Sequence, residues 1–394
     1  MNAHAFRTLP ATGAPLRVIV VGAGGMGRAW LHAVQTSPDT ELAGVVDLDP
    51  EAARIAAAAV GAPDTPTGTD QAALAAETGA EAVIDVTSPA AHLPVTLRAL
   101  DLGLPVLGEK PAAASVAEAL RLAAAAERSG LLFMVSQSRR YNRQLFRFRE
   151  LARRLGDLGI LTTEFFLAPR FGGFRDAMAH PLLLDMAIHP FDTARFLLDA
   201  EPVSVYCRGY NPAWSWYAGD AAATAVFEMT GGVRYVYTGS WCSPGLETSW
   251  NGAWRLSGAH GTAVWDGDTP PRIDANDTPP DEDSGMPDAA ESIEGALAEF
   301  VHALRTGTVP RGEIHENVMS LAMVDSAVLS ATEDRRVHVD EVLDAAHREA
   351  IATADDAERE LLASWPSART ALRRPCPTGR GGGVSRASTG RAAE

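Results

Sequence analysis

Two carboxylates and a histidine stand at regular spacing inside one strongly apolar segment, residues 181–198. Asp185, His189 and Asp192 are spaced i, i+4 and i+7, so a helix would carry them on one stripe. The rest of the segment is apolar on nearly all sides, and such a helix is buried. Burying carboxylates and an imidazole costs several kcal/mol unless they are paired or face a wet cavity. We predict that the stripe faces a cleft, with a core Asp–His hydrogen bond as the alternative; Pro190 favours the cleft because it removes an interior N–H.

Polar residues also follow two predicted strands in the first half of the chain. They are Glu109, Lys110 and Pro111 after residues 105–107, and Thr87, Ser88, Pro89 and His92 after residues 82–86. In a doubly wound sheet the ligand binds beyond the carboxyl ends of the strands, so both groups are candidates for a site. A solvated turn is the competing interpretation of the first group, and a simple helix N-terminus that of the second. Pro111 restricts the backbone before it and allows a cis bond.

A glycine-rich turn joins a predicted strand, residues 16–21, to a predicted helix, residues 28–35. The turn consists of Gly22, Ala23, Gly24, Gly25, Met26 and Gly27. The first glycine permits a tight turn, the second lets the backbone approach a pyrophosphate, and the last lets helix and strand pack closely. The helix N-terminus offers free N–H groups to phosphates. Because Asp47 closes the next strand, the context predicts a dinucleotide site, against the alternative of a glycine turn without a ligand.

Asp47 also indicates which dinucleotide binds. A carboxylate at this place accepts hydrogen bonds from both ribose hydroxyls and repels a 2′-phosphate, which predicts NAD. Leu48 follows it, where an arginine would favour NADP. Arg54, about a helical turn further on, keeps NADP open as a second possibility.

The composition limits the classes of protein that fit. The chain has 394 residues, 46% apolar and 21% charged, which is typical of a folded protein of about two domains. The net charge of −16 argues against nucleic acid or an anionic membrane as partner. No apolar run reaches the roughly 20 residues of a membrane helix, and no secretory signal is recognisable. The cysteines are few and widely spaced, so we predict no metal site, no disulfide framework and a cytoplasmic location.

The expected fold class is α/β: an N-terminal Rossmann dinucleotide-binding domain, residues 16–137, and a C-terminal α+β domain, residues 138–351, with an open mixed or antiparallel sheet. Predicted strands of the first domain are 16–21, 41–47, 82–86, 105–107 and 132–135, and its helices 28–35, 50–60, 71–78, 92–100 and 115–128. The second domain is predicted to have strands at 160–167, 203–208, 221–229, 233–240, 248–256 and 262–265, and helices at 141–155, 181–198, 292–305 and 316–331. Residues 1–15 are expected to be a loose lead-in and 266–291 a surface loop. Residues 352–394 are expected to be a disordered tail that can be deleted with little loss, with the alternative that Leu361, Leu362 and Trp365 dock as a short helix.

The glycine turn, the Glu-Lys-Pro at 109–111 and DMAIHPFD at 185–192 together resemble the glucose-fructose oxidoreductase / inositol dehydrogenase (Gfo/Idh/MocA) family. Order and spacing match over about residues 16–345. The resemblance implies a cleft between a Rossmann domain and a second α/β domain. It also implies that Lys110, Asp185 and His189 touch the hydroxyl of the reacting carbon, and that Glu109 lies near the nicotinamide ribose.

Two features of the chain bear on the substrate pocket that the resemblance implies. The family often has Gly-Gly before the Asp-containing helix, whereas this chain has His180 followed by proline, so His180 is expected in the pocket. The family's Arg-Tyr pair, here Arg140 and Tyr141, is preceded by an additional Arg139. Tyr141 is expected among the substrate contacts.

The predicted reaction is hydride transfer between nicotinamide and a secondary alcohol of a sugar, glycoside or cyclitol. His189 suits the base, since an unperturbed histidine has a pKa near roughly 6.5. Lys110 would polarise the oxygen, and Asp185 would orient the hydroxyl or hold His189. The sequence leaves open whether Lys110 or His189 is the base.

Two other functions remain open: an enzyme of the same fold that uses the nicotinamide transiently to cleave or eliminate glycosides, and a non-catalytic dinucleotide- and sugar-binding regulator. Tryptophans gathered between Trp214 and Trp265 would stack on sugar rings, or else form sheet core or a subunit interface. A homo-oligomer, dimer or tetramer, through the C-terminal sheet is expected.

Overall fold

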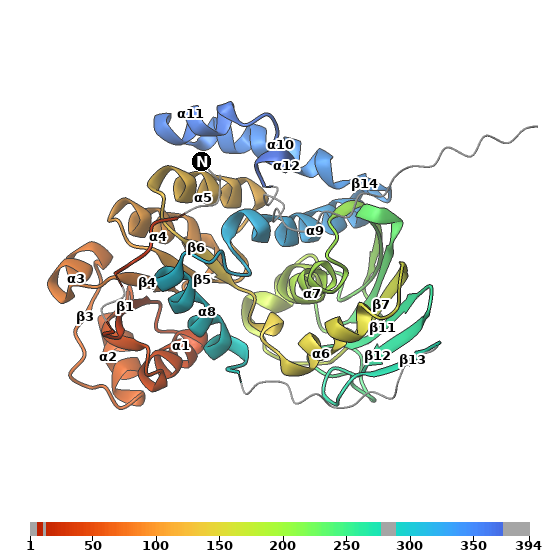
Figure 1. Cartoon of the computed structure of the whole chain (residues 1–394), viewed down its shortest axis with the longest axis horizontal. Coiled ribbons are helices and arrows are strands. Elements are labelled where there is room, and N and C mark those ends of the chain that lie inside the picture. The colour runs from red at the N-terminus through yellow and green to blue at the C-terminus, as the bar shows by residue number, and fades with distance from the viewer. Residues whose placement is uncertain (1–5, 11–12, 277–288, 373–394) are drawn as a thin grey trace, which may run out of the picture.

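Two β-sheets organise the protein, which a computed structural model describes over residues 6–10, 13–276 and 289–372 (Figure 1). The first sheet has six strands in the order β3-β2-β1-β4-β5-β6, all paired in parallel. The second has eight strands in the order β13-β12-β11-β7-β10-β9-β8-β14, of which β7 and β10 pair in parallel and the other neighbours antiparallel. The predicted fold class, a Rossmann-type sheet followed by a mixed sheet, is confirmed.

Helices cover both faces of the first sheet. Its strands are β1 (Leu16–Val21), β2 (Thr40–Val46), β3 (Thr67–Gly68), β4 (Ala82–Asp85), β5 (Val106–Glu109) and β6 (Phe133–Ser136), and its helices are α1 (Gly25–Thr36), α2 (Pro50–Ala59), α3 (Gln71–Thr78), α4 (Pro89–Asp101) and α5 (Val116–Ser129). The central strands are buried along almost their whole length because both faces meet helices. The strand order reverses between β1 and β4, so the connections leave on opposite sides and open a crevice at the carboxyl ends.

Helices cover one face of the second sheet, and the other face is open (Figure 1). Its strands are β7 (Leu158–Phe166), β8 (Pro202–Tyr210), β9 (Ala222–Met229), β10 (Arg234–Ser240), β11 (Ala253–Gly258), β12 (Gly261–Trp265), β13 (Arg272–Ala275) and β14 (Val337–His338), and before them or between them come η1 (Ser138–Arg140), α6 (Arg143–Ala152), η2 (Gly173–Ala177), η3 (Leu182–Met186), α7 (Ile188–Leu198) and η4 (Thr230–Gly232). Side chains alternate along β9: Ala225 and Phe227 are buried, whereas Val226 between them is 41% exposed. This alternation is typical of a sheet with one solvated face.

Helices α8 (Ser292–Thr306) and α9 (Ile314–Glu333) return to the first domain after the second sheet is complete. Phe300 of α8 joins the apolar cluster of β1 and α1, together with Trp30. The long helix α9 lies between the two lobes in Figure 1, and it contributes Val318 to the core beside α5 and Met323 to the core of the second sheet. It therefore fixes how the two domains sit against each other.

The first part of the predicted disordered tail is folded, which corrects the sequence analysis. Helix α10 (Val339–Thr353) is followed by α11 (Asp356–Ser364) and α12 (Ala368–Ala371). Leu362 is fully buried, and Trp365 stacks on His347 with ring centroids 5.8 Å apart. The few large apolar residues of this segment are enough to fold it because they pack against α5 and α10. Residues 373–394 of the predicted tail lie outside the described residues.

Three smaller predictions also need correction. The predicted loop 266–291 contains the edge strand β13, and its residues 277–288 lie outside the described part. Strand β11 begins at residue 253, because the chain turns at residues 250 and 251 just before it. The lead-in is anchored where it is described: the Arg7 N–H donates to the Gly130 carbonyl and the Leu9 N–H to the Leu304 carbonyl, both at 2.8 Å, while residues 1–5 and 11–12 lie outside the described residues.

Candidate active site

The glycine turn between β1 and α1 leaves open space at the carboxyl end of the first sheet. Gly22 has φ 107°, and a Cβ there would lie 2.6 Å from the Val86 carbonyl oxygen. At Gly27 a Cβ would lie 2.0 Å from the Gly22 carbonyl oxygen, so only glycine lets α1 start this close to β1. Around Gly24, by contrast, a Cβ would meet no atom within 4 Å. The turn is thus closely packed at Gly22 and Gly27 and open at Gly24, and a dinucleotide's pyrophosphate requires such an opening.

Asp47 is held beside this turn. Its Oδ2 accepts the Ala23 N–H at 2.7 Å, and its Oδ1 accepts the Asp49 N–H at 2.9 Å. Gly25 begins helix α1, and Met26 is half exposed beside it. The glycines and the carboxylate expected to bind the cofactor therefore meet at one place.

The two residues after Asp47 that bear on NADP offer no unpaired cation. Leu48 is 95% exposed. Arg54, which kept NADP open, donates to Glu51 through Nε at 2.8 Å and Nη2 at 2.6 Å on the surface of α2.

The loop after β4 is fixed by its own hydrogen bonds. The Thr87 hydroxyl donates to Asp85 Oδ1 at 2.6 Å, while Ser88 and Pro89 start helix α4. The predicted cofactor contact of His92 needs correction. Its ring is buried, with Nδ1 2.8 Å from the Pro111 carbonyl oxygen and Nε2 3.0 Å from the Thr87 carbonyl oxygen. His92 therefore links the loop after β4 to the loop after β5, and both of its ring nitrogens face protein atoms.

The segment after β5 turns sharply toward the second domain. The Lys110–Pro111 bond is cis, as the sequence allowed. Glu109 is buried, and its carboxylate accepts the Trp30 indole N–H at 2.8 Å and the Lys110 backbone N–H at 3.0 Å. Lys110 Nζ reaches the Asp185 carbonyl oxygen at 3.4 Å. Glu109 thus anchors the turn to α1, and Lys110 extends from it to the opposite domain.

The segment predicted as one helix, residues 181–198, is a π-helical turn followed by an α-helix. In η3 the Ala187 N–H donates to the Leu182 carbonyl at 2.9 Å, which is i→i+5 spacing. This wide turn shifts the register ahead of Pro190, so the regular stripe expected for the acidic and histidine side chains is broken; single π turns occur often at functional sites. Asp185 accepts from Arg175 Nε at 2.7 Å, and no bond joins it to His189 among the described residues.

Three residues of the predicted site have other partners. Asp192 is bound to Arg140 and to the Ser320 hydroxyl in the domain core. The Tyr141 hydroxyl donates to Glu299 Oε2 at 2.5 Å and packs against α8. His180 precedes the helix and lies with Nδ1 3.5 Å from Asp220 Oδ2, across the loop after β8. Asp192 thus lies in the core rather than on a cleft, whereas the placing of Tyr141 and His180 at the substrate stays a prediction.

Lys110, His189 and Arg139 lie together, and the positive charges of Lys110 and Arg139 act on the His189 imidazole. Burial lowers the pKa of Lys110, an effect that Asp185 and Glu109 oppose and Arg139 reinforces. Burial, then repulsion by Arg139 and Lys110, holds the pKa of His189 well below 6.5. His189 Nδ1 is buried and has no hydrogen-bond partner in the described part of the chain. The imidazole is therefore neutral at physiological pH and available as a proton acceptor.

Sequence reasoning missed two residues of this group. Arg139 was noted only as an additional arginine, and Arg175 was not considered. Arg175 lies in η2, on a loop without recognisable motif, and only its ion pair with Asp185 brings it to the site. No group of three His, Cys, Asp or Glu side chains within residues 6–10, 13–276 and 289–372 is arranged to hold a metal ion, and in the same ranges no helix is long and apolar enough to cross a membrane.

A Rossmann-type domain with an open glycine turn meets a second α/β domain where Lys110 contacts Asp185, and this architecture is that of a two-domain, dinucleotide-dependent oxidoreductase. Comparison with known proteins agrees. Residues 16–137 match the oxidoreductase family with NAD-binding Rossmann fold, and residues 155–264 match the GFO/IDH/MocA C-terminal domain. The chain belongs to the Gfo/Idh/MocA family, and its first domain is an NAD-binding Rossmann domain. The expected NAD-dependent dehydrogenase class is thereby confirmed at the level of the family.

Relatives extend along most of the chain. D-apiose dehydrogenase of Paraburkholderia graminis is 27% identical over 81% of this chain and 88% of its own. Inositol 2-dehydrogenase of Rhizobium meliloti is 24% identical over 82% of this chain and 99% of its own. Among solved structures, an oxidoreductase from Agrobacterium radiobacter in complex with NAD+, L-tartaric acid and magnesium superposes with a TM-score of 0.72 at 20% identity, covering 83% of this chain and 99% of that one.

Proposed function

We propose that the protein is an NAD-dependent dehydrogenase of a secondary alcohol in a sugar, glycoside or cyclitol, with Lys110, Asp185 and His189 at the reacting carbon. The observation that carries this proposal is the contact of Lys110 Nζ with the Asp185 carbonyl oxygen, because it brings the end of β5 to the helix that bears His189. The names of two relatives, dehydrogenases of D-apiose and of inositol, support a polyhydroxy substrate.

When bound, NAD+ supplies the nicotinamide ring that accepts a hydride from the alcohol carbon. The residues present fit that cofactor, since the space at Gly24 admits a pyrophosphate and Asp47 stands beside it for the ribose. The chain's own task is to orient the alcohol and remove its hydroxyl proton.

His189 is proposed as the base. Its neutral imidazole takes the hydroxyl proton as the C–H bond breaks, so the alcohol becomes a carbonyl without a free alkoxide. Lys110, in its ammonium form, donates to the same oxygen and stabilises the negative charge that develops there. Asp185 fixes the geometry: its carboxylate is held by Arg175, and its carbonyl lies against Lys110. Glu109 holds the turn that carries Lys110.

The direct test is an initial-rate assay of the purified protein with NAD+ and a panel of inositols, methyl glycosides and 1,5-anhydro sugars, and of NADH with the matching ketones. Net formation or consumption of NADH with at least one member supports the proposal. Cleavage of a glycoside without net NADH would assign the chain to the glycoside-cleaving alternative. Silence in both directions with intact NAD binding would assign it to the regulators.

We also propose that the open face of the second sheet contacts a second copy of the chain. Exposed apolar or aromatic side chains recur along it: Ile160 at 41%, Tyr206 at 43%, Tyr210 at 53% and Val226 at 41%. Such a patch on a flat sheet is typical of an interface. Light scattering should report a dimer or tetramer, and Val226→Arg should shift it toward the monomer; a monomeric wild type contradicts the proposal.

A further inference from the structure

Arg139 is a half-buried arginine without a carboxylate partner among residues 6–10, 13–276 and 289–372. Its recorded hydrogen bond is a weak one, from Nη2 to Met186 Sδ at 3.8 Å. A guanidinium has five N–H donors, and those of Arg139 that lack a protein acceptor keep contact with solvent, where a ligand can reach them. Its neighbour in sequence, Arg140, shows the usual arrangement, with Asp192 and Glu316 both bound to it at 2.6–3.1 Å. Burial lowers the pKa of Arg139 to about 10, which reflects how little compensates its charge.

The guanidinium lies at the proposed reaction centre. Arg139 and His189 line one small pocket, together with Trp250, Asn251 and Trp265. Arg139 also raises the electrostatic cost of protonating Lys110 and His189. Two carboxylates of the described chain lie beside this group and both are engaged: Asp185 is paired with Arg175, and Glu109 accepts the Trp30 indole N–H and the Lys110 backbone N–H. The pocket therefore holds excess positive charge.

The cofactor does not supply the missing anion. Arg139 follows β6, whereas the phosphate turn follows β1, and β6 is the third strand from β1 in the sheet. At roughly 4.8 Å per strand this separates the two ends by about 14 Å. The nicotinamide end of the dinucleotide is the part that would reach the end of β5, and it carries no phosphate.

We propose that Arg139 binds a carboxylate of the substrate, so the preferred substrates are polyhydroxy acids, such as aldonic or uronic acids, over neutral polyols. This inference rests on the proposed function, since it places the carboxylate beside the hydroxyl that His189 and Lys110 address. The planar fork of an arginine matches a carboxylate in two parallel hydrogen bonds. A neutral analogue would displace water from the guanidinium and offer it no charged acceptor, which is how a polar pocket rejects a substrate that lacks its partner group.

The test compares acid and neutral partners of similar shape: D-gluconate against D-glucitol, and D-glucuronate against D-glucose. Their affinities for the full-length protein loaded with NADH are measured by titration calorimetry, and their rates with NAD+ by NADH formation. We expect each acid to bind roughly 10- to 100-fold more tightly than its neutral partner, the range of charge-assisted hydrogen bonds. Arg139→Gln should abolish this preference while NADH affinity is kept.

Arg255→Gln is the matched control, because Arg255 is exposed on the opposite face of the second sheet; it should keep the preference. If the wild type binds acid and neutral partners equally, the inference is overturned. It is also overturned if Arg139→Gln keeps the preference for acids. Arg139→Lys, which keeps the charge and loses the fork, should show a smaller preference and guards against misfolding of the Gln variant. Arg139-dependent binding of acids without turnover of any compound would refute the dehydrogenase proposal and leave the subsite standing.

Discussion

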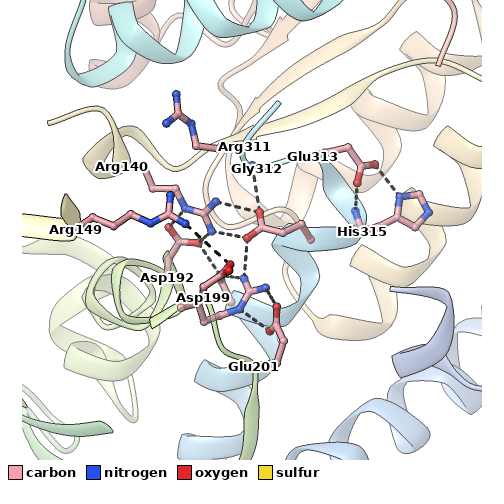
Figure 2. Close-up of polar contacts among 12 residues, drawn as sticks. Arg140, Arg149, Asp192, Asp199, Glu201, Arg311, Gly312, Glu313 and His315 are labelled. Carbon is pink, nitrogen blue, oxygen red and sulfur yellow. Dashed lines mark hydrogen bonds and ion pairs between the residues drawn. The ribbon is translucent and has the colours of Figure 1, made fainter. Parts of the chain in front are cut away.

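Arg140 and Asp192 form a bidentate ion pair in the core between the two domains, with Nε–Oδ2 and Nη2–Oδ1 both at 2.6 Å (Figure 2). Each side chain is 2% exposed. Glu316 of α9 completes the pair from a third element. The pair joins the end of β6 to helix α7, and so it fixes the segments that carry Arg139 and His189. Asp192, the last residue of the motif that suggested a catalytic stripe, thus has a structural role.

The first prediction concerns this pair. Asp192→Asn should lower the free energy of unfolding by about 3–5 kcal/mol, because it leaves a buried guanidinium incompletely compensated. Denaturant unfolding measures the change. Asp199→Asn is the control: that carboxylate is 92% exposed and 4.0 Å from Arg149, so its loss should cost less than about 0.5 kcal/mol. Similar losses in both variants would contradict the structural role of the pair.

The second prediction concerns the base. His189→Ala should lower kcat by roughly 10²–10⁴, the contribution of general base catalysis, with NADH affinity nearly unchanged. The exposed His32→Ala serves as control and should keep wild-type rates. A small effect of His189→Ala on kcat, together with a large effect of Lys110→Met, would assign the base to Lys110.

The third prediction is the pH dependence of alcohol oxidation. His189 must be neutral to accept a proton, and its pKa lies well below 6.5 because of burial and the cations beside it. The rate should therefore fall on the acid side only below pH 6.5. Lys110 must be charged, and burial lowers its pKa from 10.5, so the rate should fall on the basic side before pH 10.5. A kcat/KM profile against pH gives both limbs, and an acid limb above pH 6.5 would contradict the assignment of His189.

The fourth prediction concerns the cofactor. NADH should bind more tightly than NADPH, because Asp47 repels a 2′-phosphate, Leu48 follows it and Arg54 is paired with Glu51. Asp47→Ser should reduce the difference by weakening NADH binding and relieving the repulsion. Titration calorimetry with both cofactors measures it. Tighter NADPH binding by the wild type would refute the prediction.

The fifth prediction concerns the C-terminal helices. Leu362→Ala should cost about 2–5 kcal/mol of stability, the usual range for a fully buried leucine, which the expectation of a dispensable tail does not allow. Glu360→Ala, on the exposed side of α11, is the control and should change stability little. Equal melting temperatures of the two variants would show that α11 does not contribute to the core.

The sequence by itself determined the features that depend on neighbouring residues. The glycine turn, the first-domain helices and the alternation of the second sheet follow from local sterics and hydrophobic periodicity, and the structure has them where they were predicted. Lys110 and His189 could be named as candidate site residues for the same reason, since each lies in a short motif next to a strand or helix that the sequence predicts. The turn geometry at Lys110 was also foreseen, because proline allows it.

Only the tertiary structure decided which partner each polar side chain takes. Arg140 meets Glu316 across 176 positions and Tyr141 meets Glu299 across 158, and no local pattern relates such residues. The π turn in η3 shifts the register by one residue just before α7, and a periodicity argument that assumes one regular helix does not show such a shift. The missing carboxylate partner of Arg139 within the described residues could not be predicted either, because whether an arginine has a partner depends on all the elements that pack around it.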